Sequence, residues 1–391
     1  MRLAVFVDQV FRRDGPVLTT DESYVLFLRS LAEEVGGITL IGRLAPEPGR
    51  GPYLVDEGTF SLVPLPYYPD LHRLWRADPR LYGRVRREVR AQAGNWDALL
   101  VSGPHPLGQM IARDCIGLGI PVILVVRQNL VQQMAAHRGV RRWAAVTAAA
   151  ALEWDFRRLA RGRTVLAVGT EMAEAYGRVA RRVTNHFACL VDQARFEMFS
   201  RMGGSGGDPA RLVCVSRLSP EKGHAYLLSA LARLDARGVT CRLDIVGTGQ
   251  TEASLRAQAE RLGLSSRVTF HGYVPYGPAL FDLYRRAGAL VLPSVTEGFP
   301  QVINEALSLG LPVIATRVGG IPSFLTHEVT ALLTPPRDVP ALADAVQRMV
   351  GDEMLRWRLG RNGRALMGDN TLEANRARVL ESLHDEIRPR P

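Results

Sequence analysis

The sequence predicts an α/β protein made of two doubly wound parallel sheets, one in each half of the chain. Three observations support this prediction. The chain has 391 residues, which suits two domains of ordinary size. Short β-branched segments alternate with longer helix-like segments along nearly its whole length. A glycine-rich segment at residues 202–209 separates the two series and is typical of a flexible hinge.

Each half contains five expected strands, with longer helix-like segments between them. In the first half the expected strands are Leu3–Val7, Ile38–Ile41, Ala98–Val101, Val122–Val126 and Val165–Val168. In the second half they are Leu212–Val215, Arg242–Val246, Val268–Phe270, Ala289–Leu292 and Val313–Ala315.

These strands set the expected domain limits. We expect one Rossmann-like domain at 1–200, a hinge at 201–209, a second such domain at 210–368, and a C-terminal helix at 369–391 that packs back toward the first. Ligands of open α/β sheets bind at the carboxyl ends of the strands. The two domains should therefore face each other across a cleft that binds the substrates.

The charge of the chain is uneven. The net charge is +10, and residues 72–163 alone contain 16 Arg and six acidic residues. Such a basic segment suits nucleic acid, an anionic membrane surface or a phosphorylated substrate. Trp143 and Trp154 lie among these arginines, which favours a membrane surface, while the alternative is a plainly solvated Arg-rich face. No reader motif for nucleic acid is visible, so we expect no nucleic-acid partner.

The cysteines and the N-terminal segment indicate the cellular location of the protein. The four cysteines lie far apart without a Cys-x-x-Cys pair, which argues against a zinc site or disulfides and fits a reducing cytoplasm. Asp8 interrupts the first apolar segment, so we expect a strand there and no signal peptide. No apolar stretch approaches the roughly 20 residues of a membrane span. We expect a cytoplasmic protein, with the inner face of the membrane as an alternative location.

The turn at Ser216–Gly223 follows an expected strand and precedes an expected helix. Arg217 and Lys222 flank this turn, where the N-terminal dipole of the helix already favours an anion. A forked guanidinium and a compact ammonium suit a diphosphate, and the alternative is a solvated loop. Lys222 is the only lysine among 49 basic residues, which favours the diphosphate site. The glycines at 247 and 249 end the next strand, and they are a weaker signal.

Two glutamates follow the strand Ala289–Leu292. Glu297 lies in the loop ahead of a helix that begins near Pro300, and Glu305 lies inside this helix among apolar neighbours. A carboxylate in each place can accept hydrogen bonds from sugar hydroxyls, one from a hexose and one from a ribose. The alternative for Glu305 is an exposed helix charge.

Taken together, these motifs resemble the retaining glycosyltransferases of family 4, which have the GT-B fold. The segments that carry the resemblance cover about residues 210–340 and are Ser216–Gly223, Val246–Gly249, the Glu-x7-Glu pair Glu297/Glu305 and Leu311–Pro322. In the first half the resemblance is limited to the strand order and to Val191–Phe196.

The resemblance implies a nucleotide-sugar site in the second domain. Lys222 and Arg217 would hold the diphosphate, Glu305 the ribose, Glu297 the hydroxyls of the transferred sugar, and Val274 the base through its backbone. The implied donor-binding residues are Arg217, Lys222, Gly247, Gly249, Val274, Glu297, Gly298, Phe299, Pro300 and Glu305.

The first half departs from the family pattern in two places. Many relatives have a Gly-Gly loop after the first strand, where this chain has Asp14 and Gly15. The strand Val122–Val126 usually leads to a histidine, and here it leads to Arg127 and Gln128. Asp14, Gly15 and Gln128 would line the acceptor side. Either Arg127 or His105 would take the place of the catalytic histidine beside Glu297, unless His105 is an ordinary loop residue.

The resemblance also implies a mechanism. The chain contains no Asp-x-Asp pair of the kind that holds a divalent cation, so we expect metal-independent, cofactor-free transfer with retention by front-face displacement. The donor would carry UDP in preference to GDP. The acceptor would be a carbohydrate, a lipid-linked sugar or a small natural product. The alternatives are a nucleotide-sugar 2-epimerase and a nucleotide-sugar binder without catalysis.

Overall fold

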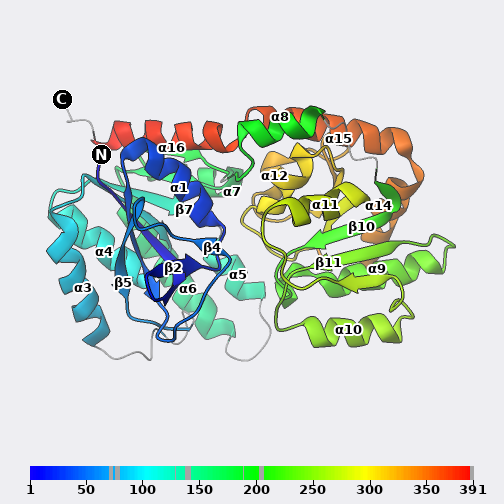
Figure 1. The fold of residues 1–391 in the computed structure, drawn as a ribbon, viewed down its shortest axis with the longest axis horizontal. Helices are drawn as coiled ribbons and strands as arrows, with labels where there is room; N and C mark the ends of the chain where they lie inside the picture. Colours follow the sequence, from blue (N-terminus) through cyan, green and yellow to red (C-terminus); the bar gives the residue numbers. More distant parts are fainter. Residues whose placement is uncertain are drawn as a thin grey trace. The chain divides into compact units, whose positions relative to one another are not determined.

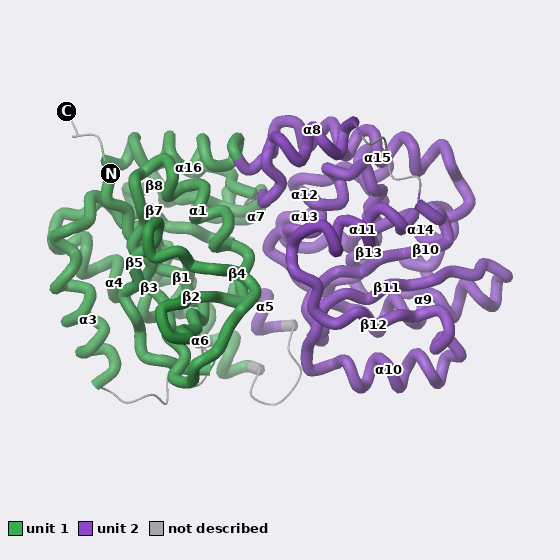
Figure 2. The backbone as a smooth tube through the Cα atoms, in the orientation of Figure 1, with its two compact units in different colours: residues 1–131, 143–188, 373–391 green, residues 132–142, 189–372 purple. Residues whose placement is uncertain are grey.

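Two α/β units make up the computed structural model (Figure 1, Figure 2). Unit 1 comprises residues 1–131, 143–188 and 373–391, and unit 2 comprises residues 132–142 and 189–372. The structure describes residues 1–69, 74, 80–127, 129–136, 142–187, 189–201 and 207–387. Residues 202–206 of the expected hinge lie outside this description.

The parallel strands of unit 1 run in the order β5-β3-β1-β6-β7-β8-β9. The central strands β6, β7 and β8 and the first five residues of β1 are almost entirely buried, as expected for a parallel sheet covered on both faces, whereas the edge strands β5 and β9 are only partly buried. The strands of this sheet are β1 (Leu3–Asp14), β2 (Val17–Thr20), β3 (Ile38–Leu44), β4 (Tyr53–Leu54), β5 (Phe60–Leu65), β6 (Ala98–Gly103), β7 (Val122–Val126), β8 (Thr164–Ala167) and β9 (Arg182–Asn185).

Strand β1 is longer than the sequence predicts. Its first residues pair with β6 and β3, and its last residues turn back as a hairpin with β2. Gly15 makes the turn with φ at 58°, a left-handed conformation that glycine adopts without steric cost. Strand β2 in turn pairs with β4. These antiparallel strands escaped prediction because they are short and their pairing partners are set by the turn.

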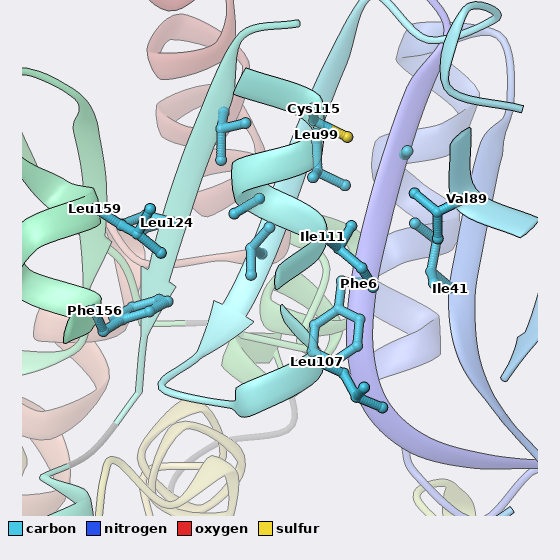
Figure 3. Packing of buried hydrophobic residues seen from close by; sticks show 14 of the residues in the cluster. Phe6, Ile41, Val89, Leu99, Leu107, Ile111, Cys115, Leu124, Phe156 and Leu159 are labelled. Atoms are coloured by element: carbon cyan, nitrogen blue, oxygen red, sulfur yellow. The ribbon is translucent and has the colours of Figure 1, made fainter. Parts of the chain in front are cut away.

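Helices cover the sheet of unit 1. Leu107, Ile111 and Cys115 follow one side of α4 and pack beside Phe6 and Leu99 of the strands (Figure 3). This spacing of four residues is the apolar stripe of an amphipathic helix. The helices that contribute residues to unit 1 are α1 (Tyr24–Val35), α3 (Arg80–Ala93), α4 (Pro106–Gly117), α5 (Leu130–Ala136), α6 (Arg142–Ala160), α7 (Gly169–Gly177) and α16 (Leu372–Ile387).

In unit 2 the parallel strands run in the order β12-β11-β10-β13-β14-β15, which is the Rossmann order. The strands are β10 (Asp208–Val215), β11 (Arg242–Val246), β12 (Val268–Phe270), β13 (Ala287–Leu292), β14 (Val313–Thr316) and β15 (Leu332–Thr334). The helices are α8 (Gln193–Arg201), α9 (His224–Asp235), α10 (Glu252–Arg261), α11 (Pro278–Arg286), α12 (Gln301–Ser308), α13 (Ile321–Phe324), α14 (Val339–Gly351) and α15 (Glu353–Gly368). The predicted fold class of two Rossmann-like sheets is confirmed.

Both sheets reverse their strand order beside their first strand. In unit 1 the reversal lies between β1 and β6, and in unit 2 it lies between β10 and β13. Open α/β sheets bind ligands at the carboxyl ends of the strands at such a switch point. The topology therefore singles out the loops after β10 and β13, and the ends of β1 and β6.

Two further observations concern membranes and thiols. In the part of the chain that the structure describes, none of the helices is both long enough and apolar enough to cross a bilayer. The four cysteines are buried as free thiols.

Candidate functional site

The turn after β10 is built on backbone contacts with the turn after β11. The N–H of Ser216 donates to the carbonyl of Val246 at 3.0 Å, and the N–H of Leu218 donates to that of Thr248 at 2.8 Å. The chain then forms a 3₁₀ turn at Pro220–Lys222 and enters α9. Lys222 is thus held immediately ahead of a helix N-terminus.

Lys222 meets Glu297 at the switch point of unit 2. Its Nζ lies 2.6 Å from Oε1 of Glu297, and the Oγ of Ser294 donates to the same oxygen at 2.8 Å. The side chains of Lys222 and Glu297 are only 13% and 7% exposed. An ammonium has three donor hydrogens, so a salt bridge with one carboxylate leaves it able to bind an anion as well. The loops after β10 and β13 are thereby joined through opposite charges.

Glycines let these loops pack backbone against backbone. A Cβ on Gly247 would lie 2.0 Å from the carbonyl oxygen of Ser216, and one on Gly319 would lie 1.8 Å from that of Glu297. Both glycines have a positive φ. Gly249 approaches the carbonyl of Leu218 in the same way. These positions exclude any side chain, so the glycines shape the site whether or not they touch a ligand.

Glu305 lies on α12, which begins after Pro300. It is buried, and its Oε2 accepts a hydrogen bond of 2.6 Å from the hydroxyl of Tyr284 on α11. Burial raises the pKa of Glu305 to about 7, although the hydrogen bond from Tyr284 acts in the opposite direction. Glu305 is thus a buried group with a raised pKa and not an exposed helix charge.

The other expected donor residues lie on the same group of loops. Arg217 is exposed on the turn that carries Lys222. Val274 is half-buried in the loop after β12, and this loop contacts the neighbouring turn because the N–H of Gly247 donates to the carbonyl of Gly272 at 2.7 Å.

Gly298, Phe299 and Pro300 follow Glu297 and lead into α12. The N–H of Gly320 donates to the carbonyl of Gly298 at 2.7 Å, which holds this loop against the one after β14. The ring of Phe299 packs edge-on against the ring of Phe324, with 4.8 Å between the two ring centroids. All the donor residues expected from the sequence therefore gather at the carboxyl ends of one sheet.

In unit 1, His105 belongs to a polar cluster in which Tyr68 and Arg43 are buried and Asp8 is exposed. Its Nδ1 accepts from the N–H of Leu107, and its Nε2 lies 3.1 Å from the hydroxyl of Tyr68. Tyr68 donates to Asp8 at 2.7 Å, and Arg43 lies 3.0 Å from the same carboxylate. Burial lowers the pKa of His105 to about 4, while Asp8 acts in the opposite direction. His105 is therefore a neutral imidazole that holds Asp8 and Tyr68 at the switch point.

The remaining expected residues of unit 1 lie apart from this cluster. The guanidinium of Arg127 lies 4.6 Å from the ring of Tyr24, so Arg127 and His105 point to different partners. Asp14 and Gly15 form the tip of the β1–β2 hairpin, where Asp14 pairs with Arg50 at 2.7 Å. Gln128 lies outside the described residues.

Several residues of these clusters escaped the sequence argument. Ser294 and Tyr284 fix the two glutamates, and Asp8 and Tyr68 surround His105. Asp8 carried a usable signal, because it directly follows the buried apolar residues Leu3–Val7 of the expected strand, and ligands of open α/β sheets bind at the carboxyl ends of such strands. Tyr68 carried none, because its partners lie 60 and 37 residues away in the chain.

Comparison with known proteins shows what the second unit and the whole fold are similar to. Residues 197–366 match the family model of the glycosyl transferases group 1. Solved structures of the same architecture align along nearly the whole chain, and together with the two Rossmann-like sheets they show the GT-B fold.

Curated relatives match parts of the chain. Alpha-D-kanosaminyltransferase of Streptomyces kanamyceticus is 31% identical over 196 residues, which are 50% of each chain. D-inositol 3-phosphate glycosyltransferase of Corynebacterium glutamicum is 36% identical over 153 residues, 37% of this chain and 36% of the relative. The chain thus spans half or less of the curated relatives it matches.

Two solved structures illustrate the fold. Sucrose-phosphate synthase from Thermosynechococcus elongatus superposes with a TM-score of 0.74 at 19% identity, over 98% of both chains. Anabaena HepE, solved in complex with UDP and glucose, gives a TM-score of 0.69 at 19% identity, over 98% of this chain and 99% of that one.

Proposed function

We propose that this protein is a retaining glycosyltransferase that moves a sugar from a nucleoside-diphosphate sugar to a hydroxyl group of an acceptor. The observation that carries the proposal is the buried pair of Lys222 and Glu297. It lies at the topological switch point of a Rossmann-like sheet, within the segment that matches the glycosyl transferases group 1.

The charges of this site suit the leaving group. When the bond between the sugar C1 and the diphosphate oxygen breaks, negative charge grows on the diphosphate. Lys222 and Arg217 supply fixed positive charge beside it, and the N-termini of α9 and α12 add the positive ends of two helix dipoles. The site is thus preorganised to stabilise the departing diphosphate without a metal ion.

The two glutamates suit hydroxyl recognition. Glu297 accepts hydrogen bonds from the transferred sugar while Lys222 and Ser294 hold its carboxylate in place. Glu305 accepts from the ribose, and Tyr284 orients it. A carboxylate that is already hydrogen-bonded to protein groups loses little freedom when a sugar binds.

In the proposed reaction, the acceptor oxygen bonds to C1 on the face that the diphosphate leaves, so that the anomeric configuration is retained. The acceptor proton passes to the departing phosphate oxygen, which balances the step. Arg127 or His105 plays the electrostatic part of the histidine that usually follows the strand Val122–Val126 in the family pattern. The neutral state of His105 favours Arg127 for the charged role, because an imidazole with a pKa of about 4 carries no charge at neutral pH.

We propose UDP as the nucleotide in preference to GDP. The support is that HepE was solved with UDP-glucose, while a relative that is 36% identical over 169 residues is a GDP-mannose-dependent mannosyltransferase of Mycobacterium tuberculosis. The acceptor is proposed to be a carbohydrate, a lipid-linked sugar or a small natural product.

The decisive experiment incubates the purified protein with UDP-, GDP- and ADP-sugars, with and without a panel of sugars, sugar phosphates and alkyl glycosides. Acceptor-dependent release of nucleoside diphosphate, with retained configuration by NMR of the product, is the expected result. Release of an epimer or of free nucleotide without an acceptor would instead identify an epimerase. Tight binding of a nucleotide without any turnover would identify a binder that has lost catalysis.

A further inference from the structure

The outward side of helix α6 carries two exposed tryptophans. Trp143 is 70% exposed and Trp154 is 61% exposed. They are eleven residues apart, about three helical turns, and therefore lie on the same side of the helix. On the opposite side, Phe156 and Leu159 are buried in the core of unit 1 (Figure 3).

The surface between the tryptophans is apolar apart from one threonine hydroxyl. Residues 143–152 contain no charged side chain, and Thr147, Ala150 and Ala151 are exposed between the two rings. The first acidic residue, Glu153, turns inward and accepts from the hydroxyl of Tyr176 at 2.9 Å. A helix at a protein surface normally presents charged side chains to water. This face is thus an exposed apolar patch that neither the core nor the donor site explains.

Salt bridges show which arginines near this helix are already neutralised. Asp114 of α4 binds both Arg86 and Arg90 of α3, and Asp155 of α6 binds Arg113 of α4. The three helices therefore form one layer. On α3, Leu81 is buried in the core, and Arg86 and Arg90 are bridged to Asp114, so this helix contributes less free cationic surface than the count of its arginines suggests. Trp75 lies outside the described residues.

The layer nevertheless keeps a large excess of positive charge. Residues 80–93, 106–117 and 142–163 together contain eleven Arg and four acidic residues, which are Glu88, Asp114, Glu153 and Asp155. Arg158 lies on the same side as the tryptophans, with its guanidinium 4.9 Å from the ring of Trp154. The apolar face is thus bordered by the cation of Arg158.

We propose that this face of α6 docks on an anionic phospholipid bilayer. The indole rings enter the headgroup region, where tryptophan is enriched in membrane proteins, and the arginines meet the lipid phosphates. Nucleic acid suits the face less well, because a phosphate backbone could pair with the arginines but would leave the apolar surface between the two indole rings exposed, whereas a bilayer buries it. The core contacts of Phe156 and Leu159 keep the helix folded on unit 1, so docking requires no unfolding.

The test is sedimentation of the full-length protein with phosphatidylcholine vesicles, with or without phosphatidylglycerol, at low and high salt. We expect binding to the anionic vesicles, weakened by salt. The double variant Trp143→Ala/Trp154→Ala should lower the partition coefficient roughly tenfold. Arg158→Glu should weaken binding and its dependence on salt. The measurement needs neither donor nor acceptor, so its outcome is independent of the proposed transfer activity.

The chain offers a matched control in Trp357→Ala. Trp357 on α15 is 57% exposed, and Arg361 lies 5.2 Å from its ring, much as Arg158 lies over Trp154. This variant should bind vesicles like the wild type. The proposal is overturned if the wild-type protein does not sediment with anionic vesicles at low salt, or if the double variant and the control bind equally well. A double variant that loses self-association without a change in vesicle binding would also overturn it, by assigning the face to a second copy of the chain.

Discussion

The ion pair between Lys222 and Glu297 joins two roles that the sequence resemblance assigns separately. The ammonium was expected on the diphosphate and the carboxylate on the sugar, and the structure places them 2.6 Å apart. Each charge is buried and depends on the other, since an isolated buried charge is strongly unfavourable. In the proposed function, the pair would present both a cation and a carboxylate to neighbouring parts of one donor.

Replacing the ammonium should affect both turnover and stability. Lys222→Ala should lower kcat by about 10²–10³-fold, as expected when one preorganised donor to a developing charge is removed. It should also destabilise the fold by about 3 kcal/mol because Glu297 loses its partner. Steady-state kinetics and urea unfolding measure the two effects.

A control for this variant is Arg256→Ala, which removes an exposed cation that pairs with Glu252 on α10. An exposed pair of this kind contributes no more than about 0.5 kcal/mol, so neither turnover nor stability should change noticeably. Near-normal turnover of Lys222→Ala would contradict the proposal that Lys222 holds the diphosphate.

Glu305 predicts a dependence of stability on pH. Its pKa is about 7 in the folded protein, above the value of about 4.3 in an unfolded chain. The stabilisation from its neutral form is therefore complete below about pH 4 and is lost as the pH rises through 7. Glu305→Gln has no such titration, so its stability relative to the wild type should increase between about pH 4 and pH 8.

Urea unfolding of both proteins across this range tests the prediction. Glu260→Gln, at an exposed position on α10, serves as the control for replacing a surface glutamate. A difference between Glu305→Gln and the wild type that stays constant with pH would contradict the assigned titration.

At the scale of elements, the site depends on how closely four loops approach at the carboxyl ends of the strands. These loops contact each other through backbone atoms, and glycine at 247, 249 and 319 is what allows the approach. Strand topology decides which loops become neighbours. Sequence motifs decide whether the neighbours can come close.

Gly319→Ala should therefore damage the site more than an ordinary glycine substitution does. The new methyl group would lie 1.8 Å from the carbonyl oxygen of Glu297 and would have to displace it. The loop after β13, which carries Glu297, would then move as well. Gly238→Ala is a matched control, because Gly238 also has a positive φ but a Cβ there meets nothing within 4 Å.

We expect Gly238→Ala to cost about 1–2 kcal/mol of stability with normal UDP binding, since only the backbone is strained. Gly319→Ala should cost more and should weaken UDP binding. Thermal unfolding and calorimetric titration with UDP measure both quantities. Equal losses of stability with equal UDP affinity would show that the approach of the two loops has no influence on the site.

At the scale of the whole molecule, the prediction concerns metal ions. The chain contains no Asp-x-Asp pair, and within the described residues no group of three or more His, Cys, Asp or Glu could hold a metal ion. Fixed cations and helix dipoles would then stabilise the leaving diphosphate. Activity should survive EDTA, as measured by nucleoside diphosphate release; a complete loss that magnesium restores would contradict this mechanism.

The fold was largely predictable from local pattern. Buried parallel strands form continuous apolar runs, so β6, β7, β11 and β14 could be placed almost to the residue. Strands β2, β4, β5, β9 and β15 were missed, because they are short or only partly buried and take their pairing from distant segments.

The sequence by itself determined the fold class and grouped the residues expected to bind a donor, because each motif is local and follows a strand whose carboxyl end is known. Only the tertiary structure decided which side chains share a partner. It paired Lys222 with Glu297, enclosed Glu305 beside Tyr284, and turned His105 toward Asp8. It also showed that α6 leaves two tryptophans outside the core. These outcomes depend on contacts between residues tens of positions apart or on the packing of whole helices, and no local pattern encodes them.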